Sequence, residues 1–367
     1  MNARSTIKGL VLLLVCVATL FPFPAEAGRP LVVFANPAAQ GDVFFQPLTD
    51  FMQAAADDLG FELETYYGNR NHVIIDDNVQ AIFKRDPLPD YVIAMNARGS
   101  GMTLLEKAKE TGVKVAFINQ GFLGEQRDLV GLPGEKYPNW LFEFLPDDTH
   151  AGWLLASTLI KTAKTGNMGS KIQITAISGH ESSAASTLRE RGLKKALAEH
   201  PSATLNQTVH AGWKREQARK LAGALLKRYP ETDILWSASD LMALGICDAV
   251  RAAHATPGKD ILIGGVDWAD FALDMVEEGA FTATVGGHFM DGGWALVMLY
   301  DHIHGIRIPA TSTSHFSVIT ADNVEQYRRH FGTNRWGEID FRRFSRHLNP
   351  QLKQYDFGLE AVLRQLQ

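Results

Sequence analysis

Residues 234–287 read ILWSASDLMALGICDAVRAAHATPGKDILIGGVDWADFALDMVEEGAFTATVGG, and this stretch decides the fold. Its first apolar run, 234–239, has the length of a buried strand, and Asp240 after it is expected to cap an amphipathic helix. A second apolar run, 261–266, ends at Asp267. Strand, helix and strand in this order predict a parallel sheet, and open α/β sheets bind ligands at the carboxyl ends of their strands. We therefore expect Asp240 and Asp267 to lie together at a ligand-binding edge.

The segments SASDLMALG, GVD and TATV follow one another in this stretch. In this order they resemble the type I periplasmic solute-binding proteins, the family of the ribose-binding protein, which shares its fold with repressors of the lactose-operon type. The resemblance extends from Leu31 to about Asn323. It implies two Rossmann-like α/β lobes with parallel sheets and a three-segment hinge, with a ligand held in the cleft between the lobes.

Strand-like and helix-like segments alternate along the rest of the chain, as in βαβ units. We expect strands at 31–36, 61–67, 91–96 and 114–119, an irregular stretch at 121–146, and further strands at 171–178, 204–210, 234–239, 261–267 and 281–286. With the hinge that the resemblance implies, residues 28–146 and 287–312 form an amino-terminal lobe, and residues 147–286 and 313–323 form a carboxy-terminal lobe. Residues 324–367 form an extension that packs on a lobe or docks a partner.

Residues 1–27 have the pattern of a cleavable secretory signal. Arg4 and Lys8 precede an apolar run from Leu10 to Phe23, and small residues stand at Ala25 and Ala27, before a cleavage site at Gly28. The run is shorter than the ~20 apolar residues that span a bilayer. We therefore expect export to the periplasm.

The composition is that of an ordinary soluble protein, with 46% hydrophobic and 21% charged residues. A formal net charge of −5 argues against nucleic-acid binding. After cleavage only Cys247 would remain of the two cysteines, so no intrachain disulfide is expected.

Candidate ligand contacts on the first lobe follow two of its strands. Phe44 and Phe45 match the aromatic pair that stacks on the ligand ring in the family, and Asp42 stands where the ribose binder has an asparagine. We expect one of these two phenylalanines in the core and the other in the cleft. Asn119 and Gln120 replace the aspartate and arginine that hold sugar hydroxyls in aldose binders, which argues against a simple pentose or hexose as ligand.

On the second lobe, Arg189 matches the family's ligand-binding arginine through the pattern Arg-x-x-Gly-Leu-x-x-Ala-Leu that begins at this residue. Trp213 matches an aromatic residue that stacks on the ligand. Ser239 and Asp240 stand where the ribose binder has asparagine and aspartate, although Asp240 also suits a plain helix cap. At the last crossover Gly287 replaces a glutamine, which leaves room for a larger ligand or for His288 to reach in.

The sequence shows no signal of catalysis or of metal binding. The sequence has no Gly-x-Ser-x-Gly elbow, no phosphate loop and no His-Glu-x-x-His, and its 12 histidines lack the spacing of a zinc site. We therefore expect no enzymatic activity, no cofactor and no metal.

The resemblance implies a monomeric periplasmic binding protein that captures a small polar ligand, a sugar or sugar-like molecule, by hinge closure and presents it to an ATP-driven (ABC) importer. The alternative is a ligand-sensing accessory protein for a membrane sensor, a histidine kinase or diguanylate cyclase, similar to the autoinducer-2 receptor. The extension favours this alternative, because Trp336, Phe341, Phe344 and Tyr355 make it too aromatic for a disordered tail.

Overall fold

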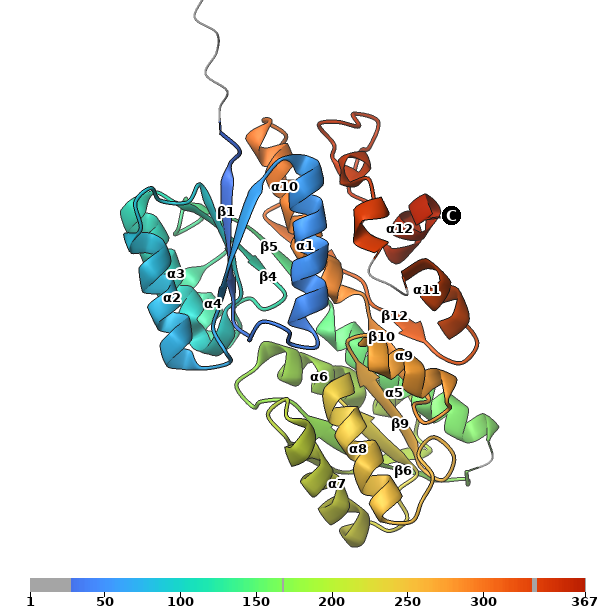
Figure 1. Ribbon diagram of the computed structural model, residues 1–367. Helices are drawn as coiled ribbons and strands as arrows, with labels where there is room; N and C mark the ends of the chain where they lie inside the picture. The colour runs from blue at the N-terminus through green and yellow to red at the C-terminus, as the bar shows by residue number, and fades with distance from the viewer. Residues whose placement is uncertain (1–27, 167, 332–334, 367) are drawn as a thin grey trace, which may run out of the picture.

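The structure, a computed structural model, describes residues 28–166, 168–331 and 335–366, so the predicted signal peptide at 1–27 lies outside the described residues. Two α/β lobes make up the molecule, and each is built on a six-stranded sheet with helices on both faces (Figure 1). The predicted fold class is confirmed.

The first lobe has an entirely parallel sheet with the strand order β11-β5-β4-β3-β1-β2. Its strands are β1 (Leu31–Asn36), β2 (Glu62–Tyr67), β3 (Tyr91–Ala94), β4 (Lys114–Ile118), β5 (Trp140–Pro146) and β11 (Thr311–Ser314). Its helices are α1 (Phe45–Leu59), α2 (His72–Lys84), α3 (Ser100–Thr111), α4 (Gly124–Val130) and α10 (Asp291–Ile303). The late helix α10 packs on α1, so a distant segment of the chain completes this lobe.

The second lobe has the strand order β12-β10-β9-β8-β6-β7, in which only β12 runs antiparallel to its neighbour. Its strands are β6 (Ile172–Ser178), β7 (Ala203–His210), β8 (Ile234–Ser237), β9 (Leu262–Val266), β10 (Ala283–Gly286) and β12 (Ser317–Ile319). Its helices are α5 (Asp148–Thr165), α6 (Ala184–Glu199), α7 (Arg215–Arg228), α8 (Asp240–Ala252) and α9 (Asp270–Glu277). Cys247 of α8 is a free, buried thiol.

The chain passes between the sheets after β5, after β10 and after β11. These passages place the hinge where three segments lie side by side. Because β11 pairs with β5 as far as Ser314, the first sheet extends past the boundary that we expected at residue 312.

The expectation of an irregular stretch at 121–146 is wrong. This stretch contains α4 and the strand β5, which is an interior strand of the first sheet, paired with β4 and β11. The sequence WLFEFLP of β5 has a charged residue in its middle. Hydrophobicity alone therefore does not identify this segment as a buried strand. Glu143 is 2% exposed and is paired at 2.6 Å with Arg127 of α4. This ion pair allows the charge of Glu143 to be buried, and both partners lie within residues 121–146.

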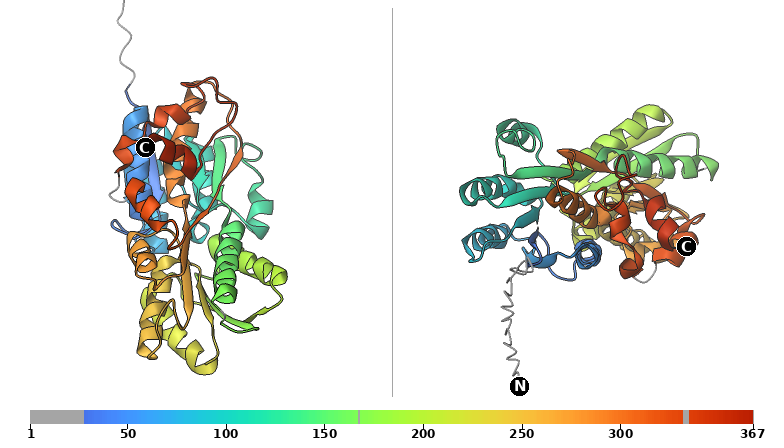
Figure 2. Two further views of the ribbon diagram at one scale, coloured as in Figure 1. Left: turned by 90° about the vertical axis from the view of Figure 1, so that its right-hand side faces the viewer. Right: turned by 90° about the horizontal axis from the view of Figure 1, so that it is seen from above.

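The extension packs against both lobes. Its helix α11 (Val324–Phe331) lies on α9 of the second lobe, where Arg328 pairs with Asp274 and, at 2.6 Å, with Glu277. The remainder, with the short turns η3 (Arg335–Glu338) and η4 (Phe341–Phe344) and the helix α12 (Leu359–Leu366), covers α1 and α10 of the first lobe (Figure 2).

Aromatic contacts dominate the part of the extension that covers the first lobe. Phe341 is fully buried and meets Phe51 edge-to-face at 5.1 Å between ring centroids, while Phe357 stacks on Trp294 at 5.0 Å. Gly293 makes this approach possible, because a Cβ there would lie 2.6 Å from the ring of Phe51. The extension thus completes the hydrophobic core of the first lobe.

A carboxylate at the end of α10 anchors the extension. Asp301 is buried and accepts hydrogen bonds from the Ser345 hydroxyl at 2.5 Å, the Tyr355 hydroxyl at 2.8 Å, and the backbone N–H groups of Arg346 and His347 at 2.8 and 3.1 Å. Four donors satisfy the oxygens of one carboxylate, so this single group holds residues 345–347 and Tyr355 of the extension.

Replacing Phe341 by alanine is expected to lower the free energy of unfolding by about 3–5 kcal/mol, the cost of deleting a buried phenylalanine ring. Urea unfolding of the full chain measures this change. Leu348→Ala is the matched control, because Leu348 belongs to the same extension but is 44% exposed. Equal stability of the two variants would show that the extension does not belong to the core.

Candidate functional site

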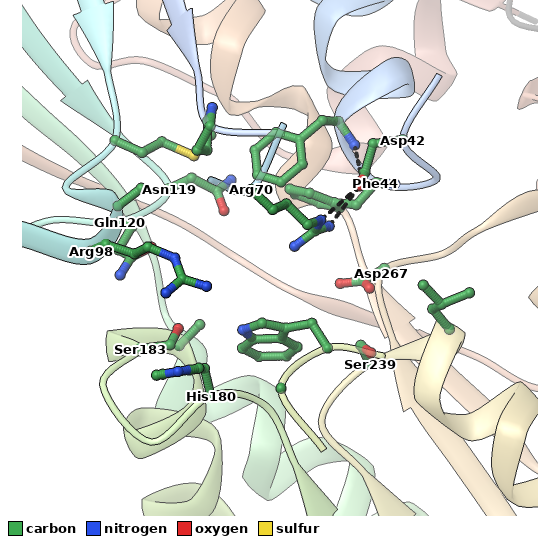
Figure 3. A pocket seen from close by; sticks show the side chains of 18 of the residues that line it. Asp42, Phe44, Arg70, Arg98, Asn119, Gln120, His180, Ser183, Ser239 and Asp267 are labelled. Carbon is green, nitrogen blue, oxygen red and sulfur yellow. Dashed lines mark hydrogen bonds and ion pairs between the residues drawn. The ribbon is translucent and has the colours of Figure 1, made fainter. Parts of the chain in front are cut away.

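A cavity of about 510 Å³ lies between the lobes, at the carboxyl ends of the parallel strands of both sheets (Figure 3). The first lobe contributes polar and aromatic side chains from the ends of β1, β2, β3 and β4, and the second lobe contributes them from the ends of β6, β7, β8 and β9. The principal lining side chains are Asp42, Phe44, Phe45, Arg70, Arg98, Asn119 and Gln120 of the first lobe, His180, Ser182, Ser183, Arg189, Trp213, Lys214, Ser239 and Asp267 of the second, and His288 between β10 and α10.

Every residue that we predicted as a ligand contact lines this cavity except Asp240. The predicted residues brought together there are Asp42, Phe44, Phe45, Asn119, Gln120, Arg189, Trp213, Ser239, Asp267 and His288. Both phenylalanines are partly buried lining residues, so the expected division into one core and one cleft residue does not hold.

Asp240 lies beneath the cavity wall, and its carboxylate is used by the protein itself. It accepts hydrogen bonds from the backbone N–H of Ala269 at 3.0 Å and from the Thr284 hydroxyl at 2.8 Å. It does not cap α8 as we expected, because the Ser239 hydroxyl accepts from the N–H of Met242 instead. Burial raises the pKa of Asp240 to about 7, against the lowering effect of these hydrogen bonds.

Arg189 of α6 is the centre of the second-lobe wall, although it is only 3% exposed. Its Nε donates to Asp148 Oδ1 and its Nη1 donates to the carbonyl of Ala238, both at 2.7 Å. Its guanidinium also lies 3.6 Å from Asp267 Oδ1. Burial lowers the pKa of Arg189, but Asp148, Asp267 and Asp240 more than offset this effect and raise the pKa above its ordinary value. The guanidinium is therefore a permanent positive charge inside the lobe.

Two glycines bring Arg189 and Asp148 together. A Cβ at Gly152 of α5 would lie 1.9 Å from the backbone oxygen of Arg189, and a Cβ at Gly192 of α6 would lie 2.0 Å from that of Thr149. Only glycine permits α5 and α6 to approach so closely. The Gly192 of the motif that identified Arg189 therefore serves to place the guanidinium on its carboxylate.

His288 links the hinge to this charge. Its Nε2 lies 3.2 Å from Nη2 of Arg189, and its ring stacks on Phe44 with centroids 4.5 Å apart. Burial, followed by the nearby Arg189 charge, lowers the pKa of His288 well below its ordinary value. The imidazole is therefore neutral at pH 7 and accepts a hydrogen bond from Arg189.

Asp267 faces the cavity from the end of β9 with its side chain 14% exposed. Burial raises the pKa of Asp267 well above its ordinary value, although Arg189 acts in the opposite direction. Its backbone has a φ of 139°, which an L-residue rarely adopts.

Strained backbone conformations gather around the cavity. Besides Asp267, the non-glycine lining residues with positive φ are Asn69, Arg70, Arg98, Asn119 and Trp213. Each such residue costs about 1–3 kcal/mol and persists only where its surroundings impose it. Such strain concentrates at ligand clamps, which supports this cavity as the functional site.

The indole of Trp213 lies against Gly179, where a Cβ would approach the ring to 2.1 Å. Its centroid is 5.9 Å from the guanidinium carbon of Arg189, within the range of a cation–π contact. The ring is thus held flat by the tip of β6 and presents an apolar surface to the cavity.

On the opposite wall, Asp42 Oδ2 accepts from Nε and Nη2 of Arg70 at 3.0 and 2.7 Å. The amide of Asn119 donates to the carbonyl of His288 at 3.1 Å, so it connects the first lobe with the hinge. Figure 3 shows Asp42, Arg70 and Asn119 facing Ser239 and Asp267 across the cavity.

Sequence reasoning missed Arg70, His180, Lys214 and the buried partner Asp148. Arg70 follows β2, and a search of the residues after every predicted strand would have found it. The role of Asp148 has no local signal, because it depends on the packing of α5 against α6. Among residues 28–166, 168–331 and 335–366, no group of three or more His, Cys, Asp or Glu side chains is arranged to hold a metal ion. No helix in this part of the chain is long and apolar enough to cross a membrane.

Comparisons with known proteins agree on one family. A model described as "Periplasmic binding protein domain" matches residues 32–305. A solved structure of a periplasmic sugar-binding protein from Pseudomonas fluorescens is 34% identical, with a TM-score of 0.82 over 91% of this chain and 99% of that chain. The D-allose-binding periplasmic protein of Escherichia coli is 32% identical over 44% of this chain, and the match spans about half (52%) of that relative. A D-apiose import binding protein of Actinobacillus succinogenes is 23% identical over 69% of this chain and 74% of its own length.

The buried carboxylate of Asp240 predicts a pH dependence of stability. Its folded pKa of about 7 exceeds the unfolded value of ~4, so the folded state binds the proton more tightly. The contribution of Asp240 to stability is therefore full below pH ~4 and is lost as the pH rises to about 7. Relative to the wild type, Asp240→Asn is expected to gain stability across this range, as measured by urea unfolding in steps of pH. A difference that stays constant with pH would contradict the raised pKa.

Proposed function

Because this chain belongs to the periplasmic binding protein family, we propose that it captures a sugar or sugar-like ligand in the cavity between its lobes and delivers it by hinge closure. The observation that carries this proposal is the convergence of Arg189, Asp267 and Trp213 of one lobe with Asp42 and Phe44 of the other on one space. Aromatic faces suit the apolar faces of a sugar ring, and charged groups make strong hydrogen bonds to its hydroxyls.

In this proposal the two lobes supply different kinds of contact to the ligand. Trp213 offers a flat surface from the second lobe, while Phe44 and Phe45 offer aromatic rings from the first. Asp267 accepts and Asn119 and Gln120 donate or accept hydrogen bonds in this proposal. Arg189 supports the site indirectly in this proposal. Its donors already bind Asp148 and Ala238, and it orients Asp267 toward the ligand.

Closure follows from the placement of these groups on two bodies. A ligand that contacts both walls favours the closed form by its difference in affinity for the closed and open forms. In this proposal the residues before Gly28 direct export to the periplasm, and the closed form is what an ATP-driven importer recognises. The names of the relatives that bind D-allose and import D-apiose support this reading.

The extension no longer favours a signalling role. Trp336, Phe341 and Phe344, whose aromatic character suggested a docking surface, are buried against the first lobe or the hinge. Their presence is accounted for by packing, so importer delivery is the function that we retain.

Isothermal titration calorimetry of the exported protein, stripped of bound compounds, tests the proposal. A panel of pentoses, hexoses and their oxidised or phosphorylated derivatives should contain a binder, whereas a matched panel of amino acids should not. Small-angle scattering should then show a smaller radius of gyration with the binder. Binding of amino acids alone, or chemical turnover of the bound sugar, would overturn it.

Trp213→Ala is expected to weaken binding of that ligand about tenfold or more, because the variant loses both the stacking and the buried area of an indole. Calorimetry gives the dissociation constants. Trp213→Phe should retain most of the affinity, since it keeps an aromatic face. Trp153→Phe is the remote control, because Trp153 hydrogen-bonds Glu199 on α6 and does not line the cavity. An unchanged affinity in Trp213→Ala would remove the indole from the binding site.

A further inference from the structure

The acids that line the cavity are already paired with arginines. Asp42 forms its ion pair with Arg70 at 2.7 Å, and Asp267 lies 3.6 Å from Arg189. The deeper carboxylate of Asp148 is also bound to Arg189, at 2.7 Å. Each of these three carboxylates therefore already has an arginine neighbour within the protein, and Arg189 serves two of them.

Two cations of the lining remain after this pairing. Arg98 of the first lobe and Lys214 of the second are exposed lining residues. Within the described part of the chain, neither side chain has an ion pair or hydrogen bond to another residue. Figure 3 shows Arg98 directed across the cavity toward Ser183 and His180 on the opposite wall.

The loop that carries Arg98 is held in place by hydrogen bonds of Asn96. The Asn96 amide donates to the carbonyl of Gly121 at 3.1 Å and to Gln126 Oε1 at 2.8 Å, and its oxygen accepts from the N–H of Gly101 at 3.1 Å. Arg98 itself has a φ of 52°. A non-glycine residue held in this conformation is over-determined by its surroundings, so the backbone position from which Arg98 reaches the cavity is fixed.

The charge of the cavity has the opposite sign to that of the protein. Arg70, Arg98, Arg189 and Lys214 stand against Asp42 and Asp267 of the lining and Asp148 behind Arg189, which leaves an excess of one positive charge, whereas the whole chain has a formal net charge of −5. A cleft with one sign of charge focuses the field and attracts ligands of the other sign. A neutral sugar would have no ionised group to pair with this excess charge.

We propose that the ligand is an anionic sugar-like molecule whose carboxylate or phosphate group pairs with Arg98 and Lys214 while its ring contacts Trp213. This inference rests on the proposed function and specifies the ligand class of the same cavity. A planar guanidinium binds either anion through two parallel hydrogen bonds, and Lys214 adds a point charge from the other lobe. Because the two cations lie on different lobes, the anion would also favour the closed form.

Matched ligand pairs test the proposal by calorimetry: D-galactose with D-galacturonate, D-glucose with D-glucuronate, and D-ribose with D-ribose 5-phosphate. At least one acid should bind about tenfold or more tightly than its neutral partner, because hydrogen bonds to an ionised group are the stronger ones. The carboxylate and phosphate members distinguish the two sources of the anion. Raising the salt concentration should weaken the acid more than the neutral sugar.

Arg98→Gln is expected to reduce the affinity for that acid about tenfold and to reduce the affinity for the neutral partner by a clearly smaller factor. The control is Arg251→Gln, since Arg251 is an exposed arginine of α8 that does not line the cavity. A neutral sugar that binds as tightly as its acid, or an Arg98→Gln variant with full affinity for the acid, overturns this inference but leaves the proposed function intact. Failure of every member of the panel overturns both.

Discussion

The buried ion pair between Arg189 and Asp148 is the interaction on which the site depends. A single guanidinium binds the first turn of α5, the carbonyl of Ala238 after β8 and the hinge imidazole of His288, and it lies beside Asp267 after β9. Burying two charges costs several kcal/mol per ion, so such a pair contributes little net stability. Removing one partner would leave a buried charge alone, which is far more costly. The pair therefore fixes positions rather than adding free energy.

This constraint explains the chemistry of the cavity floor. Burial of His288, followed by the charge of Arg189, lowers the pKa of this imidazole, and the burial of Asp240 and Asp267 raises the pKa values of these two carboxyls. Asp240 and Asp267, with raised pKa values, thus lie beside the guanidinium of Arg189, whose positive charge is permanent. The strained backbone at Asp267 belongs to the same arrangement, because its carboxylate must turn toward both Arg189 and the cavity.

Much of this arrangement could be predicted from the sequence, because parallel strands place the residues after them at one edge. That rule located Asp267, and together with the family resemblance it located Asp42, Asn119 and Trp213, without knowledge of the packing. It was wrong for Asp240, since a carboxylate at the start of a helix serves equally well beneath the wall. It also missed β5, whose interior Glu143 is explained only by Arg127, and Asp148, whose role depends on how closely two helices approach. Contacts between segments distant in sequence leave no local periodicity.

The extension has a consequence for how the molecule meets other proteins. It covers one face of α1 and α10 and also holds α9 through Arg328, so it occupies a surface that spans the two lobes. Any larger assembly that senses the relative position of the lobes has to rest on this added layer or come from the opposite side. The direction from which such an assembly can bind this protein is thus limited by the extension, whose described residues do not line the cavity.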